Sequence, residues 1–260
     1  MNTGSYQFEK LESRHHEGTM LAERANMRLE DFPNLLVRHR FPTDGHILEV
    51  GTAQGIRAKV IAEKFPRTQT IGIDRSAELM AVDSTPNLKF QYADVYDLPF
   101  LDNTFDFVYA RLVFMHLSDP LKALANIKRV LKPGGRILIE DADRDCMFFE
   151  PAPPSFPDFW KKVQEGQRRW GGDPNVGRKL APLLKQAGFT GIQIETQPII
   201  GGGLEIDFLV RTLMPSLNVY LSPEDRDQGN NAIKDLADLA NTNPLATFYH
   251  FWFVVSGEKK

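Results

Sequence analysis

The stretch "HILEVGTAQGIRAKVIAEKFP", residues 46–66, decides how the chain is expected to fold. An apolar run over residues 47–50 leads into a turn with glycines at positions 51 and 55, and apolar residues at helical spacing follow. A buried strand, a glycine turn and a helix in this order are typical of the first unit of a parallel α/β sheet that binds a nucleotide at its strand ends. The stretch therefore predicts a nucleotide-type pocket at this turn.

The composition fits one enlarged domain. The chain has 260 residues, 42% of them hydrophobic, which is enough to bury a substantial core. Its 31 Lys and Arg against 34 Asp and Glu give a net charge of -3 without any dense basic run, so we expect no nucleic-acid or membrane partner. The single Cys146 excludes an intramolecular disulfide. Because no signal segment or bilayer-length apolar run is visible, we expect a cytoplasmic monomer or homo-oligomer.

Short apolar runs alternate with helical patterns from residue 47 onward. The runs at 47–50, 70–73, 88–92, 105–110 and 136–140 are typical of strands buried on both faces. Such alternation predicts a Rossmann-like, doubly wound α/β fold with helices on both sides of a parallel sheet. Before it, residues 18–39 fit one amphipathic helix, or two short helices broken near Pro33, and we expect residues 1–41 to form a helical lid.

The part after Glu140 is less regular. The proline-rich stretch "EPAPPSFPDF" predicts an extended crossing loop, and the turn at Trp170 is expected to be structural. Strand-like alternation returns in "FTGIQIETQPII" and in "ATFYHFWFVV". We expect these two outer strands to pair antiparallel, with a helical insertion at about 201–241 between them, so that residues 42–260 form one domain.

The glycine turn does not fit a phosphate. A dinucleotide requires glycine at three places in the turn, and here those places hold Gly51, Ala53 and Ile56. Carboxylates mark the strand ends instead. Asp74 follows Gly55 by 19 residues, where an acceptor for ribose hydroxyls belongs, and Asp94 ends the third strand, where it could accept from the amine of a base. The pattern predicts a nucleoside site without a phosphate site.

Five motifs in order resemble those of class I S-adenosylmethionine-dependent methyltransferases of the small-molecule type. They are "ILEVGTAQG", "IGIDRS", "YADVYDLPF", "FDFVYARLVFMHLSDP" and "VLKPGGRILI". The resemblance implies a seven-stranded sheet whose last strand is antiparallel, with S-adenosylmethionine as cofactor across the carboxyl ends of the first strands. Ala53 departs from the family pattern, which usually has a third glycine there, and adds one methyl group where the backbone passes the cofactor.

The resemblance and the residues together predict the cofactor site. Backbone groups of the 51–55 turn suit the methionine part, Asp74 the ribose, Asp94 with the Val95 amide the adenine, and Arg111 the carboxylate. The full set of expected cofactor residues is Glu49, Gly51, Thr52, Ala53, Gln54, Gly55, Asp74, Arg75, Ala93, Asp94, Val95, Ala110 and Arg111.

His116 is the candidate catalytic residue, because the family often has a histidine facing the cofactor cleft at this motif. The alternative is a histidine that bonds to backbone at the start of the next helix. We expect no metal: the acids of "EDADRD", residues 140–145, are more commonly an exposed strand end than a cation site.

The expected activity is methyl transfer from S-adenosylmethionine to oxygen, nitrogen or carbon of a small acceptor. The N-terminal helix, the crossing after Glu140 and the insertion carry the side chains expected around the acceptor, so an apolar or aromatic molecule fits best. These side chains are Tyr6, Phe8, Met20, Met27, Phe148, Phe149, Trp160, Phe208 and Met214. Alternatives are a protein that binds the cofactor as a sensor or for another reaction, and a nucleotide-dependent oxidoreductase, against which the missing three-glycine motif argues.

Overall fold

The structure is a computed structural model that describes residues 4–6, 14–80 and 83–260, with only the backbone for residues 14–16. The described residues form one seven-stranded sheet in the order β3-β2-β1-β4-β5-β7-β6. The strands are β1 Gly45–Val50, β2 Thr68–Asp74, β3 Leu88–Tyr92, β4 Phe105–Arg111, β5 Leu131–Glu150, β6 Thr190–Gly201 and β7 Thr247–Glu258. Strands β1 to β5 pair in parallel, and β7 pairs antiparallel with both β5 and β6. The predicted fold class is confirmed.

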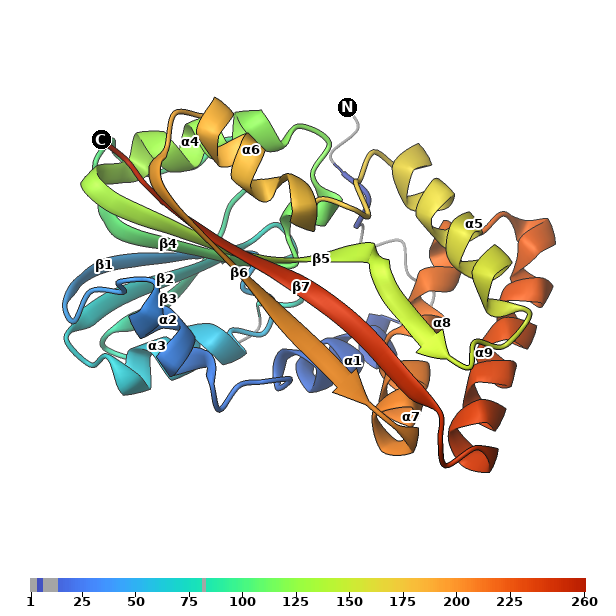
Figure 1. The fold of residues 1–260 in the computed structure, drawn as a ribbon. Coiled ribbons are helices and arrows are strands. Elements are labelled where there is room, and N and C mark those ends of the chain that lie inside the picture. Colours follow the sequence, from blue (N-terminus) through green and yellow to red (C-terminus); the bar gives the residue numbers. More distant parts are fainter. Residues whose placement is uncertain (1–3, 7–13, 81–82) are drawn as a thin grey trace.

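Helices cover both faces of the sheet. They are α1 Arg14–Ala25, α2 Phe32–Arg38, α3 Ile56–Lys64, α4 Pro120–Val130, α5 Phe156–Arg169, α6 Leu180–Gln186, α7 Gly203–Thr212, α8 Met214–Leu217 and α9 Arg226–Thr242. Figure 1 shows α4 and α6 on one face and α2 and α3 on the other, while α5, α7, α8 and α9 gather at the far end of β5 and β7. Within the described residues, no helix combines the length and the hydropathy that crossing a bilayer requires.

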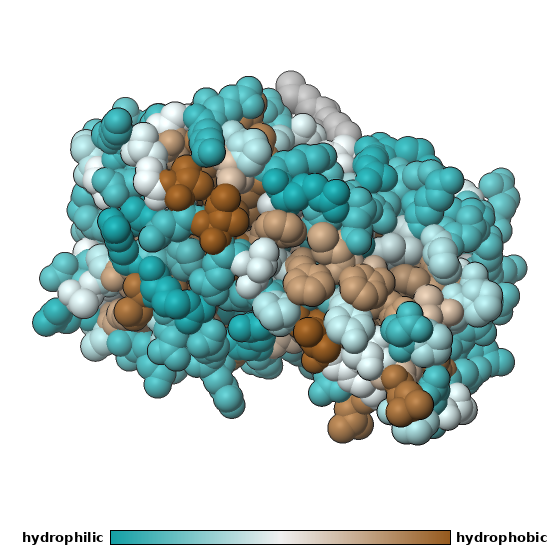
Figure 2. All heavy atoms as spheres, viewed as in Figure 1, coloured by the Kyte–Doolittle hydropathy of each residue, from teal (hydrophilic) through white to brown (hydrophobic). Residues whose placement is uncertain are grey.

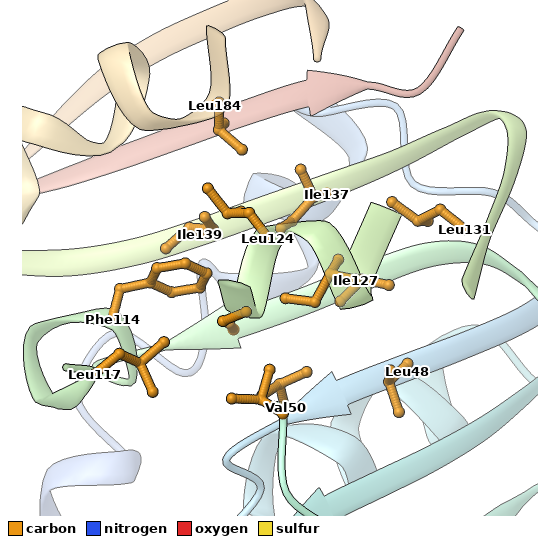
Figure 3. Close-up of a cluster of buried hydrophobic side chains, with 14 of the residues drawn as sticks. Leu48, Val50, Phe114, Leu117, Leu124, Ile127, Leu131, Ile137, Ile139 and Leu184 are labelled. Carbon is orange, nitrogen blue, oxygen red and sulfur yellow. The ribbon is translucent and has the colours of Figure 1, made fainter. Parts of the chain in front are cut away.

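Alternate side chains of β4 enter two different cores, which explains the continuous apolar run in the sequence. Val108 packs in the cluster that contains α4 and α6, and Tyr109 packs in the cluster beneath α2. Figure 3 shows Leu124 and Ile127 of α4 beside Ile137 of β5 in the first cluster. A strand buried on both faces needs no polar alternate residue.

Strand β5 is longer than predicted. The sequence pattern ends it at Glu140, but the strand continues to Glu150 because β7 pairs with it from Arg136 to Glu150, with a register shift between Ala142 and Met147. The acids of residues 140–145 are also placed differently from the expectation of an exposed strand end. Glu140, Asp141 and Asp143 are buried, whereas Asp145 is exposed. The prediction is wrong for the first three acids because β7 and the following helices cover this part of the strand.

The extended ends of β5 and β7 support a second core together with α5, α7, α8 and α9. Phe149, Trp160, Met214 and Phe248 are buried in it, so three of the side chains expected around the acceptor are structural. Figure 2 shows brown and tan residues across the middle of the face in view. Phe148 is among the exposed apolar side chains of this part of the molecule.

Two helices, α1 and α2, precede the sheet, and Pro33 lies in the first turn of α2. Gln54 Nε2 donates to Gly18 O at 2.9 Å, which ties α1 to the turn after β1. Arg24 Nη1 donates to Thr212 O at 2.6 Å, which ties the same helix to the end of α7. Helix α1 therefore links the parallel sheet to the inserted helices. Residues 1–3 and 7–13 of the expected lid, Phe8 among them, lie outside the described residues.

Candidate active site

A cavity of about 280 Å³ lies where β1, β2 and β4 end. Parallel strands of a doubly wound sheet present their carboxyl ends at one edge, and ligands bind there. Helix α1, the short helical turn Phe114–His116, the end of α5 and the segment after α7 complete the wall. Seven of the expected cofactor residues line it: Gly51, Asp74, Arg75, Ala93, Asp94, Val95 and Arg111.

Four backbone N–H groups of the turn after β1 already have partners within the protein. Gly51 N and Thr52 N donate to Ile73 O at 2.8 and 2.9 Å, Ala53 N donates to Asp74 Oδ2 at 2.9 Å, and Gly55 N donates to Thr52 O at 2.8 Å. Within the described residues Thr52, Ala53, Gln54 and Gly55 do not reach the cavity wall, so Gly51 is the part of the turn that does. Because these four N–H groups are occupied, the turn is a poor anion nest.

Positive φ angles and close packing explain the two glycines of this turn. Gly51 has a φ of +72°, and a Cβ there would lie 2.4 Å from Val113 Cγ2. Gly55 has a φ of +70°, and a Cβ there would lie 2.3 Å from the Phe90 ring. Ala53, where the family pattern has glycine, also lies in the left-handed region, with a φ of +46°. The turn keeps its shape at this residue at the cost of backbone strain.

Glu49 lies beneath the turn and outside the cavity wall. It is buried and accepts a hydrogen bond from Thr52 Oγ1 at 2.6 Å. Burial raises the pKa of Glu49 to about 7, although the Thr52 hydrogen bond and the charge of Arg57 oppose the rise. The geometry gives Glu49 a role in shaping the turn.

Asp74 ends β2 and lines the cavity. Its two carboxylate oxygens accept from Ala53 N and from Ser76 N, both at 2.9 Å. Burial raises the pKa of Asp74, and these N–H donors oppose the rise. The carboxylate retains acceptor capacity on the cavity side, so it can still accept a hydroxyl group of a ligand.

The segment after β3 contributes the next part of the wall. Ala93 and Val95 are buried and line the cavity beside Asp94. Asp94 Oδ1 accepts from Tyr96 N at 2.9 Å, which holds the carboxylate in a turn against the cavity. This segment offers one carboxylate between two small apolar surfaces, an arrangement that suits a flat heterocycle with an amine at its edge.

Two neighbouring residues at the end of β4, both predicted to bind the cofactor, lie in different places. Ala110 is fully buried in the sheet core and does not reach the cavity, whereas Arg111 lines it. The Arg111 guanidinium lies 4.6 Å from the centre of the Trp252 ring. Burial lowers the pKa of Arg111 to about 10, and its Nε has no hydrogen-bond partner within the described part of the chain. Such a cation can pair with a ligand carboxylate.

His116 lines the cavity, and its ring bonds to a side chain rather than to the backbone of the next helix. Nδ1 lies 2.9 Å from Ser5 Oγ, while His116 O accepts from Ser5 N at 2.9 Å. Burial lowers the pKa of His116 to about 3, and among the neighbouring charges Arg144 lowers it most. The imidazole is therefore neutral near pH 7, with one nitrogen able to accept a proton.

Several residues of the wall were missed by the sequence interpretation. Glu17 and Arg24 lie two turns apart on one face of α1, with Oε1 and Nη2 2.6 Å apart, and their spacing of seven residues is the signal that could have revealed them. Arg144 gave no separate signal because it lies within the acidic stretch of residues 140–145 in β5. Trp170 and Tyr220 also line the cavity, which corrects the expectation that the Trp170 turn is only structural. Tyr220 carries no sequence signal.

No group of three or more histidine, cysteine, aspartate or glutamate side chains in residues 4–6, 17–80 and 83–260 is arranged to hold a metal ion. The polar groups in this cavity are guanidinium, carboxylate and imidazole groups set among apolar side chains. These groups suit an organic ligand with hydroxyl, amine and carboxylate functions.

Residues 48–139, which contain the second half of β1, all of β2 to β4 and most of the motifs, match the family model of the methyltransferase domain. This part of the chain is therefore a methyltransferase domain. The match agrees with the predicted family, and within the described residues the antiparallel seventh strand agrees with it as well.

Known methyltransferases are similar to this chain over about half of its length. A methyltransferase of Schizosaccharomyces pombe is 32% identical over 150 residues, which cover 52% of this chain and 52% of that protein. The O-methyltransferase resE of Aspergillus sclerotiorum is 34% identical over 154 residues, covering 55% of this chain and 54% of that protein. The chain thus spans about half the length of these curated relatives.

A solved structure extends the likeness of the fold. Phosphoethanolamine N-methyltransferase 2 of Haemonchus contortus, in complex with phosphomonomethylethanolamine and S-adenosylhomocysteine, superposes with a TM-score of 0.58. The match covers 88% of this chain and 52% of that chain at 21% identity. The fold of the whole sheet, including the part outside the family model, is therefore that of known methyltransferases.

Proposed function

We propose that this chain transfers a methyl group from S-adenosylmethionine to a small-molecule acceptor bound in the cavity at the strand ends. The observation that carries the proposal is the presence of Asp74 and Asp94 in one cavity wall beside a glycine turn in which four N–H groups are already used. These two hydrogen-bond acceptors suit a nucleoside that has no phosphate, and the matched family model supports the choice of cofactor.

Residues of the cavity would hold each part of the cofactor. Asp74 would accept the ribose hydroxyls, and Asp94 with the Val95 amide would bind the adenine edge. Arg111 would pair with the carboxylate of the methionine part. When bound, S-adenosylmethionine supplies an electrophilic methyl group on a sulfonium. Glu49, Thr52, Ala53, Gln54 and Gly55 would act behind this wall by fixing the shape of the turn.

The chain itself would position the acceptor and exclude water. Displacement at carbon needs an acceptor held in line and a dry site, but no nucleophilic side chain. Ser5 is held by His116 and by Tyr220, whose hydroxyl donates to Ser5 O at 3.3 Å, and Arg75 donates to Tyr6 O. These contacts support residues 1–41 as a lid over a domain of residues 42–260 with an insertion at about 201–241.

His116 would be the candidate catalytic residue for a hydroxyl or carbon acceptor. Its ring is neutral and lies in the wall beside apolar side chains of the insertion, but a pKa lowered to about 3 makes it a weak base. Leu213, Leu217 and Val219, together with Trp170, provide that apolar surface. They support an acceptor with an apolar or aromatic body.

Calorimetry with S-adenosylmethionine, S-adenosylhomocysteine, NAD and NADP tests the proposal. We expect binding of the two sulfur ligands and none of the dinucleotides. Incubation with S-adenosylmethionine carrying a labelled methyl group and a metabolite extract should then yield a labelled small molecule. Tight binding of NAD without response to either sulfur ligand would contradict the proposal.

A further inference from the structure

Arg144 is a buried cation without a counter-ion. Its side chain extends from β5 into the cavity wall, and the residue is 5% exposed. Nε donates to Gln167 Oε1 at 2.9 Å, and the guanidinium lies 5.2 Å from the centre of the Trp160 ring. Within the described residues no carboxylate forms an ion pair with it, and its terminal nitrogens donate no hydrogen bond. A buried charge of this kind is costly unless a ligand pairs with it.

The groups around Arg144 also fail to compensate its charge. Burial lowers the pKa of Arg144 to about 10 because the charged form is not compensated. Asp141, the carboxylate whose charge acts on Arg144, already accepts from Met115 N and Ala142 N, at 3.1 and 2.9 Å. By contrast, Arg24 in the same wall has Glu17 as its ion-pair partner. Arg144 thus stays available to a ligand.

Its position separates Arg144 from the residues proposed for the cofactor. Gln167 and Trp160 belong to α5, and Gln167 Nε2 donates to Met115 O at 3.0 Å, so Arg144 is anchored beside the turn that carries His116. The cofactor has a single carboxylate, for which Arg111 is the proposed partner. A second unpaired guanidinium in one cavity therefore calls for a second anionic group.

We propose that Arg144 binds a carboxylate of the methyl acceptor, so that the substrate is a small molecule with an apolar body and one acid group. This inference rests on the proposed function and names its substrate class. The planar guanidinium matches the two oxygens of a carboxylate, and one unpaired cation balances one negative charge rather than the two of a phosphate monoester. The apolar body would contact Trp170, Leu213 and Leu217.

Calorimetry on the full chain saturated with S-adenosylhomocysteine tests the proposal, with benzoate, its neutral amide benzamide, and phenyl phosphate as probes. We expect benzoate to bind at least about tenfold more tightly than benzamide. Arg144→Met should remove that preference and leave the affinity for S-adenosylhomocysteine within about twofold. Arg211→Gln, a control at an exposed arginine of α7, should keep both properties.

Equal binding of benzoate and benzamide to the wild-type chain would overturn the proposal, and so would a preference that survives in Arg144→Met. Tighter binding of phenyl phosphate than of benzoate would overturn the choice of a carboxylate. If Arg144→Met does not fold, Arg144→Lys keeps the charge without the planar fork and should reduce the preference several-fold. If the chain does not bind S-adenosylhomocysteine in the first titration, the result contradicts the proposed function rather than the role of Arg144.

Discussion

The two ends of the cavity are built in different ways. At one end, Gly51, Asp74 and Asp94 follow strands of a parallel sheet, and each is held by hydrogen bonds with residues at most two positions away, on the adjacent strand or in the turn that follows it. At the other end, Arg144, Trp170 and Tyr220 meet from segments far apart in the sequence. The comparison teaches that local strand-and-turn rules position the end proposed for the cofactor, whereas long-range packing shapes the end proposed for the acceptor.

The variant with the largest expected effect is Asp74→Ala, which tests the first end. It removes a carboxylate proposed for two ribose hydroxyls, so we expect a loss of cofactor affinity of about 2 to 4 kcal/mol. Calorimetry with S-adenosylhomocysteine measures the loss, and Asp207→Ala, at an aspartate of α7 whose side chain is 40% exposed, is the control. Equal affinities of wild type and Asp74→Ala would show that the ribose binds elsewhere.

Leu236→Ala tests whether the helical core beyond the sheet is independent of the cofactor end. Leu236 is fully buried in that core, so its truncation should reduce the free energy of unfolding by about 3 kcal/mol, measured with urea. The affinity for S-adenosylhomocysteine should stay within about twofold. Leu204→Ala, at a side chain that is 85% exposed, should change stability by about 0.5 kcal/mol or less. A loss of cofactor affinity alongside the loss of stability would show that the helical core and the cofactor end are not independent.

Glu49→Gln tests the role of buried Glu49 beneath the turn through the pH dependence of stability. The pKa of Glu49 is raised from 4.5 to about 7 in the folded chain, so its stabilising contribution is present below pH 4.5 and is lost as pH rises through 7. Relative to Glu49→Gln, the wild type should lose roughly 2 to 3 kcal/mol of unfolding free energy between pH 5 and 8. Urea unfolding at both values measures this, with Glu224→Gln as an exposed control. If the unfolding free energies of wild type and Glu49→Gln change with pH in parallel, the pKa of Glu49 is not raised by folding.

The smallest expected effect separates backbone strain from packing at the turn. Gly55 and Gly134 have φ angles of +70° and +78°, but a Cβ meets the Phe90 ring at Gly55 and open space at Gly134. Gly55→Ala should therefore cost about 1 to 2 kcal/mol more unfolding free energy than Gly134→Ala. Adding Phe90→Leu should recover part of that difference. Equal costs would mean that strain alone requires Gly55.

Sequence alone was sufficient to determine the family, the fold class and the strand-end residues of the first end. Hydrophobic runs set the strands, and because parallel strands end at one edge of a sheet, Asp74 and Asp94 could be placed together before any contact was known. The antiparallel pairing of the two outer strands around an insertion also followed from the pattern.

Only the tertiary structure decided the rest. The full length of β5 and the burial of Asp141 depend on β7, which pairs with it from about a hundred residues away. The cavity position of Arg144 depends on α5 and on the turn of His116, which no sequence period relates to it. Periodicity encodes which face of a strand or helix is buried, but it does not encode which distant side chains share a cavity, because that choice is made by packing between elements.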